Sequence, residues 1–146
     1  MRNDATSLND MIRALNDGRT FYQDAAAKVT REDLKRLFER MARTKTAIVN
    51  DMKNKVVFSG EEPSDDGSLG GGMRKAYADI KAKLATDKEA SYVSQLEEFE
   101  DRILESFRAA IEESKDPEVR GLAQKYMPEV TRDHDEMRAL KLALKH

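Results

Sequence analysis

The feature that most constrains the fold is a stripe of apolar side chains that recurs every three or four residues between positions 34 and 56. The stripe comprises Leu34, Leu37, Phe38, Met41, Ile48, Met52 and Val56. This spacing places the side chains on one face of a helix, so we expect that face to be packed against other elements. Lys45 occupies the same face. A lysine there either pairs with a carboxylate across the core or extends its amine to solvent at an edge; holding an anion or acting as a base is the functional alternative.

The same periodicity predicts four long helices and no strand. We expect these helices at about residues 7–29, 30–59, 86–111 and 116–144. The connections within the first pair and within the last pair are very short, so each pair should form an antiparallel hairpin. A long crossover joins the two hairpins, and it contains a Gly-rich run and a predicted short helix at residues 73–84. The predicted fold class is therefore all-α, a ferritin-like antiparallel four-helix bundle whose crossover, about residues 60–86, carries a short fifth helix.

Two residues interrupt the ordinary helical pattern. Gly18 lies on the apolar side of the first predicted helix. Because a glycine inside a helix costs about 1 kcal/mol relative to alanine, we expect it to permit the close approach of a neighbouring element. Pro128 lies inside the last predicted helix, where it removes one backbone hydrogen bond and should produce a kink.

Composition narrows the class of protein. Of the 146 residues, 39% are hydrophobic and 37% are charged, which suits one helical domain over residues 1–146 with a narrow core and a charged exterior. The absence of cysteine excludes disulfides, thiol catalysis and Cys-ligated metal sites. A formal net charge of −2 with interspersed signs provides no basic footprint for nucleic acid. The chain has neither a signal-peptide core nor an apolar run of about 18 residues, so we expect a cytoplasmic protein without membrane insertion.

Two further predicted helices carry ionisable groups among their apolar residues. Glu100 is the natural partner for Lys45, although a solvated position at the margin of its stripe is an equal alternative. His134 lies between Val130 and Met137, and a histidine on such a face is more often a hydrogen-bonded core residue than a metal ligand. The sequence thus predicts a buried polar cluster of Lys45, Glu100 and His134, and it offers no catalytic residue.

The ligands for a di-iron centre are incomplete. Such a centre in a four-helix bundle needs a glutamate from each of two helices and Glu-x-x-His from each of the other two. Thr131 stands where a glutamate should precede His134, Asp133 is expected to point elsewhere, and residues 30–59 contain no histidine. Glu100 and His134 remain as the candidate metal ligands, too few for tight di-iron binding. We therefore predict no metal and no other cofactor, with iron as the alternative.

The glycine-rich run in the crossover suggests a phosphate-binding loop. It reads Gly67-Ser68-Leu69-Gly70-Gly71-Gly72 and is followed by Arg74 and Lys75 at the start of the predicted short helix. Basic residues and backbone N–H groups at a helix start attract anions. The run lacks the Gly-Lys-Ser/Thr signature and a preceding strand, which favours a connector. A lid over a small-anion site is the alternative.

Short segments spread along the chain carry a family resemblance. They are Leu8-Asn9-Asp10-Met11-Ile12, Asn16-Asp17-Gly18 with Tyr22, Leu37-Phe38 with Ala42, Gly67-Ser68, and His134-Asp135 with Arg138-Ala139-Leu140. In these segments the chain resembles an uncharacterised bacterial family of ferritin-like four-helix-bundle proteins, a domain of unknown function. The resemblance covers nearly the whole chain. It implies a ferritin-like fold and no assigned activity.

A more distant similarity to rubrerythrin-like proteins provides a contrast. Their second-helix Glu-x-x-His falls on Lys45 and Ile48 of this chain, and their fourth-helix Glu-x-x-His falls on Thr131 and His134. Glu100 takes the position of a carboxylate of their third helix. This resemblance implies that Lys45 replaces the charge of a metal with a covalently attached one.

The function that we predict is that of a non-enzymatic ferritin-like bundle in which a buried polar cluster replaces a di-iron site. Its role would be stress-related assembly or partner binding, either as a homodimer or with another protein. One alternative is an iron-binding or oxidase-type ferritin-like protein. Another is a small-anion sensor that uses the Gly-rich crossover as a lid.

Overall fold

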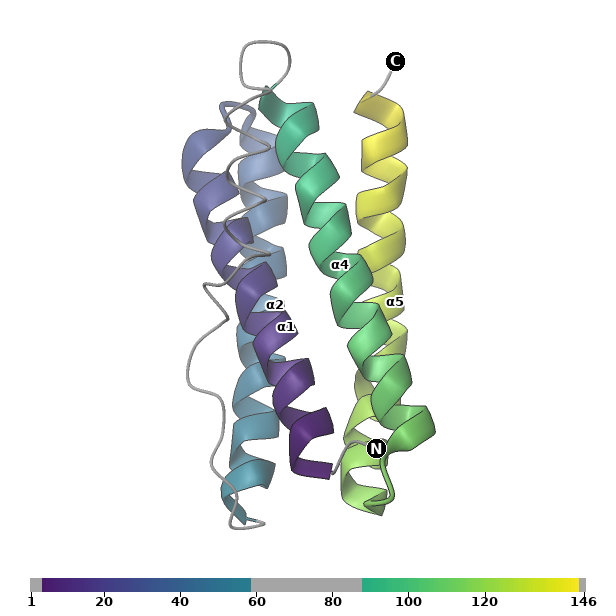
Figure 1. The fold of residues 1–146 in the computed structure, drawn as a ribbon. Helices are drawn as coiled ribbons and strands as arrows, with labels where there is room; N and C mark the ends of the chain where they lie inside the picture. Colours follow the sequence, from purple (N-terminus) through teal and green to yellow (C-terminus); the bar gives the residue numbers. More distant parts are fainter. Residues whose placement is uncertain (1–3, 59–87, 145–146) are drawn as a thin grey trace.

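Four long helices make up the part of the chain that the computed structural model describes, residues 4–58 and 88–144. They are α1 (Asp4–Lys28), α2 (Glu32–Phe58), α4 (Lys88–Glu113) and α5 (Pro117–Leu144). They lie side by side as two hairpins, α1 with α2 and α4 with α5 (Figure 1). The described ranges contain no strand. The prediction of an all-α, four-helix fold is therefore confirmed, whereas the predicted crossover and the short helix at residues 73–84 fall outside the described residues.

The helix ends agree with the predicted ones to within a few residues. Helix α1 begins at Asp4, upstream of the predicted start at Ser7, and α2 begins at Glu32. Helix α5 begins at Pro117, directly after Asp116, as the sequence predicts. The backbone N–H of Glu118 donates a 2.9 Å hydrogen bond to Asp116 Oδ1. This is the N-cap expected of an aspartate that precedes Pro117 at the first helical position.

The four helices do not pack equally closely. The two hairpins are tightly packed internally, and α1 also packs against α4 (Figure 1). Helices α2 and α5 approach one another less closely. Gly18 lies at a tight contact, since a Cβ atom there would come within 3.1 Å of Ile103 Cδ1 and 3.5 Å of Lys45 Cε. This observation confirms the expected close approach at Gly18. Helix α5 continues through Pro128 as one element.

The buried apolar residues form two clusters, one toward each end of the bundle. The first cluster includes Leu8–Leu15 side chains of α1 and extends along α5 to Val130. The second is built around Phe21, Phe38 and Phe99. None of the helices within residues 4–58 and 88–144 has the length of apolar sequence that crossing a bilayer requires.

Candidate functional site

A buried polar layer separates the two apolar clusters. On each helix a polar residue lies between the segment that enters one cluster and the segment that enters the other. These residues are Asn16 on α1, Lys45 on α2, Glu100 on α4 and Asp133 on α5, and all four are buried. Lys45, Glu100 and Asp133, together with Tyr22 of α1, are called the Lys45 cluster below. Helix periodicity thus brings one ionisable or hydroxyl group from every helix to the middle of the bundle.

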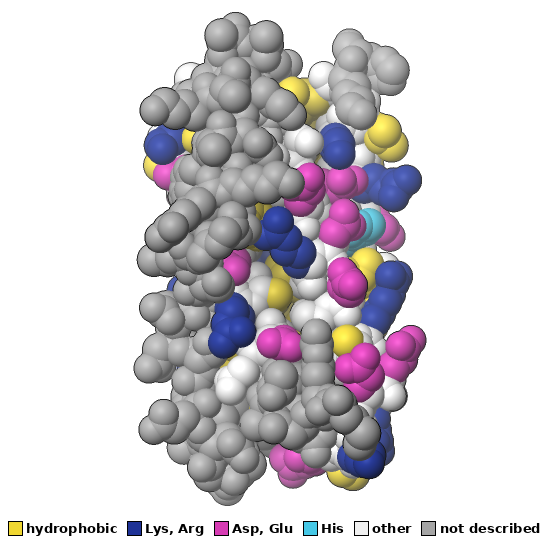
Figure 2. All heavy atoms as spheres, viewed as in Figure 1, with side chains coloured by type: hydrophobic (Ala, Val, Ile, Leu, Met, Phe, Trp, Pro, Cys, Tyr) yellow, Lys and Arg dark blue, Asp and Glu magenta, His cyan; other side chains and the backbone are white. Residues whose placement is uncertain are grey.

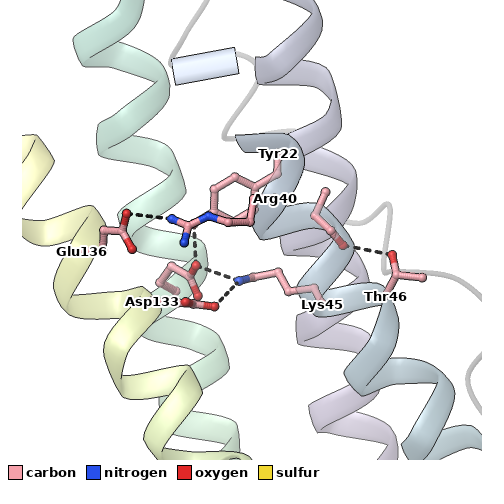
Figure 3. Close-up of polar contacts among 8 residues, drawn as sticks. Tyr22, Arg40, Lys45, Thr46, Asp133 and Glu136 are labelled. Carbon is pink, nitrogen blue, oxygen red and sulfur yellow. Dashed lines mark hydrogen bonds and ion pairs between the residues drawn. The ribbon is translucent and has the colours of Figure 1, made fainter. Parts of the chain in front are cut away.

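Lys45 forms the centre of this cluster. Its Nζ lies 2.8 Å from Glu100 Oε2 and 3.4 Å from Asp133 Oδ2. The side chains of Lys45 and Glu100 are 2% and 0% exposed, and that of Asp133 is 11% exposed. Figure 3 shows Lys45 reaching from α2 across the bundle toward Asp133 on α5. One ammonium group therefore bridges carboxylates that come from two different helices.

Tyr22 provides a second hydrogen bond to Glu100. Its hydroxyl donates a 2.5 Å hydrogen bond to Glu100 Oε2, the same oxygen that Lys45 contacts. Lys45 Nζ also lies 4.8 Å from the centroid of the Tyr22 ring, within the range of a cation–π contact. The stem of the lysine passes Gly18, where any larger side chain would compete for the same space. The glycine thus accommodates the lysine.

The electrostatics of the cluster follow from its burial. Desolvation raises the pKa of Glu100 above its ordinary value, and the ammonium of Lys45 and the Tyr22 hydrogen bond counteract only part of that rise. Burial and the adjacent Glu100 carboxylate raise the pKa of Tyr22 well above its ordinary value, so Tyr22 stays a hydrogen-bond donor. Glu100 Oε1 is buried without a hydrogen-bond partner among the described residues. A buried carboxylate that lacks one partner is costly to ionise.

His134 makes different contacts from those expected. Its Nε2 lies 2.5 Å from Asp101 Oδ1 on α4, and its Nδ1 lies 3.1 Å from Asp135 Oδ1. Both carboxylates are more than half exposed. Burial lowers the pKa of His134, but the hydrogen bonds to Asp135 and Asp101 outweigh this effect and raise the pKa above its ordinary value. His134 is itself buried, with 11% of its side chain exposed. It ties α4 to α5 through exposed carboxylates, while Lys45 and Glu100 meet in the interior.

Sequence reasoning missed two members of the Lys45 cluster. Asp133 was expected to point elsewhere, and that expectation is wrong, because its carboxylate faces Lys45. Its spacing of three residues from Val130 and four from Met137 fits the buried face of α5. His134 fits that face equally well, so spacing alone did not indicate which residue meets Lys45. Tyr22 lies in the core, but nothing in the sequence indicated the bond to Glu100.

The side chains of the Lys45 cluster do not fit a metal ion. The described residues contain no group of three or more histidine, cysteine or acidic side chains placed to hold one. In addition, Lys45 places a positive charge at the point where the carboxylates converge. A protonated lysine has no lone pair to donate to a metal and repels cations.

Two further features lie outside the Lys45 cluster, the buried Asn16 and a groove on the surface of the α1–α2 hairpin. Asn16 is fully buried, and neither polar atom of its side chain has a hydrogen-bond partner among the described residues. A groove of about 620 Å³ lies between α1 and α2, lined in part by Ala26, Lys35 and Arg43. No member of the Lys45 cluster lines this groove.

Comparison with known proteins supports a family assignment. A family model described as a domain of unknown function, DUF2383, matches residues 3–113. The match includes α1, α2 and α4 with Tyr22, Lys45 and Glu100, and it ends before Asp133. No individual curated protein matches the chain. Because the matched region covers well over half of the sequence, the chain belongs to the DUF2383 family.

Proposed function

We propose that this protein is a non-enzymatic, ferritin-like bundle in which Lys45 takes the place of a metal ion, and that it acts through assembly or partner binding. The observation that carries the proposal is the ammonium of Lys45 between Glu100 and Asp133. Carboxylates that converge from different helices are the usual ligands of a metal in such a bundle. Here a covalently attached cation supplies the positive charge.

Burial argues against catalysis at the cluster. A catalytic group must reach its substrate, directly or through one water. Tyr22 and Glu100 are fully buried, and Lys45 is 2% exposed. The hydroxyl, carboxylate and amine are also already bonded to one another. The cluster is thus suited to holding helices rather than to converting a substrate.

The structural role that we assign to the cluster is to align the four helices, α2 with α4 and α5 through Lys45 and α1 with α4 through Tyr22. A buried ion pair contributes little net stability, but a misaligned partner would leave a buried charge without compensation. Lys45 on α2 reaches both α4 and α5, so a slip of one helix turn would separate it from Glu100 or Asp133. A bundle that is aligned in this way presents its outer helix faces in fixed relative positions, as an assembly protein requires.

The test is metal binding by the wild-type protein and by two variants of Lys45. The wild-type protein should bind no stoichiometric iron in an anaerobic ferrous titration, and divalent ions should not raise its Tm. Lys45→Glu adds a third carboxylate beside Glu100 and Asp133 and should make the Tm depend on a divalent metal. Lys45→Met, which removes the same charge without adding a ligand, should not.

Two results would contradict this proposal. Stoichiometric iron in the wild-type protein, with oxidation of the ferrous ion, would establish the iron-binding alternative. A Tm that responds to metal equally in Lys45→Met and Lys45→Glu would show that binding does not depend on a carboxylate at this position. Circular dichroism of both variants without metal shows whether each is folded before the titration.

A further inference from the structure

The exposed face of α2 carries a row of arginines. Arg36, Arg40 and Arg43 are spaced four and three residues apart and are all exposed, so they form one stripe along the helix. A shallow hollow of about 510 Å³ runs beside them, lined by these arginines together with Leu37 and Glu39. Arg40 reaches across to Glu136 on α5 (Figure 3). The basic face, as we call Arg36, Arg40 and Arg43, is thus partly neutralised at its middle residue only.

A stripe of acidic residues lies on the exposed surface of α4, where Arg102 and Arg108 are also exposed. Glu98, Asp101 and Glu105 are spaced three and four residues apart and are exposed. Acidic side chains gather along this helix on the face shown in Figure 2. Asp101 contacts His134, whereas Glu98 and Glu105 have no ion-pair partner among the described residues. We call Glu98, Asp101 and Glu105 the acidic face.

The two faces match in length as well as in charge. Each spans two helical turns, about 10 Å along its axis. The arginines are spaced four and then three residues apart along α2, and the acidic residues are spaced three and then four apart along α4. The two spacings therefore match when the helices run in opposite directions. Arg36 and Arg43 are likewise without an ion-pair partner among the described residues. Two outer charges on each face are therefore available to a partner.

From this complementarity we infer that the basic face of one copy binds the acidic face of a second copy. The inference rests on the assembly role proposed above and names the partner as the same chain. Helices α2 and α4 lie diagonally across the bundle, so their outer faces point away from each other (Figure 1). One copy therefore cannot use both faces on the same neighbour, and the contact is heterologous. Repetition of such a contact produces a row or a ring of copies rather than a closed two-fold dimer.

The association should be governed by charge. Leu142 is the one large hydrophobic side chain that is exposed among the residues whose burial is described, and it belongs to neither face. Without an apolar centre, the contact depends on ion pairs that salt screens. The range of such forces shrinks from about 30 Å at 0.01 M salt to about 3 Å at 1 M.

Sedimentation velocity of the full-length protein tests the inference. The sedimentation coefficient of the wild-type protein should rise with protein concentration at about 0.01 M salt and should stop doing so at about 1 M. Arg36→Glu/Arg43→Glu should abolish the concentration dependence at low salt, and so should Glu98→Lys/Glu105→Lys. A mixture of the two variants should restore it, because each then offers the charge that the other has lost. Circular dichroism confirms that both variants are folded.

A matched control separates the faces from net charge. Arg132→Glu/Arg138→Glu changes two exposed arginines of α5 and alters the net charge by the same amount as Arg36→Glu/Arg43→Glu, so it should retain the association. The inference is overturned if the wild-type protein stays monomeric at low salt, if mixing restores nothing, or if the α5 control also loses association. Metal binding by the wild-type protein and by the Lys45 variants is measured separately, so a failure of the metal-replacement proposal can be distinguished from a failure of the contact between copies.

Discussion

The seam between α1 and α4 and the seam between α2 and α5 are held by different forces. Across the first, Phe21 lies 5.0 Å from Phe99 and 5.8 Å from Tyr92, measured between ring centroids. These rings are fully or almost fully buried. The burial of apolar surface supplies most of the stabilising free energy of this seam, and the geometry of the ring contacts adds a smaller contribution. Apolar rings therefore dominate the α1–α4 seam, although the hydrogen bond from Tyr22 of α1 to Glu100 of α4 also crosses it.

The α2–α5 seam is bridged by polar side chains. The contacts, at successive levels of the bundle, are Arg40 with Glu136, Lys45 with Asp133, and Asp51 with Tyr126 and Lys125. Because these helices approach less closely than the others, long polar side chains span the distance between them. The difference teaches that one seam is stable because of what it buries, whereas the other depends on correct pairing.

Truncation within the α1–α4 seam should have one of the two largest effects. Phe99→Ala removes a buried ring that packs at a tilt against Phe21, and we expect a loss of about 3–5 kcal/mol in the free energy of unfolding. Adding Phe21→Ala should increase the loss. Removing the second ring enlarges the cavity that Phe99→Ala leaves and does not compensate for it. Urea denaturation followed by circular dichroism measures both values. A double variant as stable as the wild type would contradict the apolar account of this seam.

Breaking the Lys45 cluster should cost as much but should be reversible by a second change. Glu100→Leu leaves the buried ammonium of Lys45 without its closest carboxylate, and we expect a loss of about 3–5 kcal/mol. Lys45→Met in the same chain removes the stranded charge, so the double variant should recover most of that loss. Recovery of stability in the double variant would show that the loss comes from an unpaired charge. The Phe99→Ala/Phe21→Ala pair, in contrast, should show no recovery. If Glu100→Leu unfolds at the same urea concentration as the wild type, the cluster is not a structural tie.

A smaller loss of stability is expected from breaking the contact of Asp51 with Tyr126, at one end of the α2–α5 seam. Tyr126→Phe removes the 2.5 Å hydrogen bond from the Tyr126 hydroxyl to Asp51 Oδ2, while Lys125 still lies 3.4 Å from the same oxygen. We expect a loss of about 0.5–1.5 kcal/mol in the free energy of unfolding. Asp51→Asn, which weakens both contacts, should cost slightly more. Equal stability of Tyr126→Phe and the wild type would mean that this contact does not hold the seam.

The smallest effect is a dependence of stability on pH through His134. Because its pKa is raised in the folded protein, the folded state retains a proton that the unfolded state releases near pH 6.5. The stabilisation should be complete below about pH 6.5 and should disappear as the pH rises through the folded-state pKa. We expect less than about 1 kcal/mol, since the carboxylate partners are exposed. Urea titrations of the wild type and His134→Gln at several pH values should converge at high pH; a constant difference would exclude this titration.

The pairing of Lys45 with Glu100 could be anticipated because both residues lie among apolar positions at helical spacing. The contact between Asp133 and Lys45 could not be anticipated, since Asp133 and His134 are adjacent and both lie close to the buried face of α5. Both side chains are buried, each 11% exposed. In the structure Asp133 faces Lys45, and His134 reaches the exposed Asp101. The rotation of α5 against α4, to which sequence spacing is insensitive, decides which of the two meets Lys45.

The number, type and approximate ends of the described helices follow from local sequence alone, because apolar spacing, caps and helix-breaking residues act over a few residues. The unequal seams do not follow from it. The apolar stripes of α2 and α5 look as regular as the others, yet these two helices meet through charged and hydroxyl groups. That outcome depends on the distances and rotations of helices packed at once around Gly18, Lys45 and their neighbours. Such distances arise only when all four helices share one core.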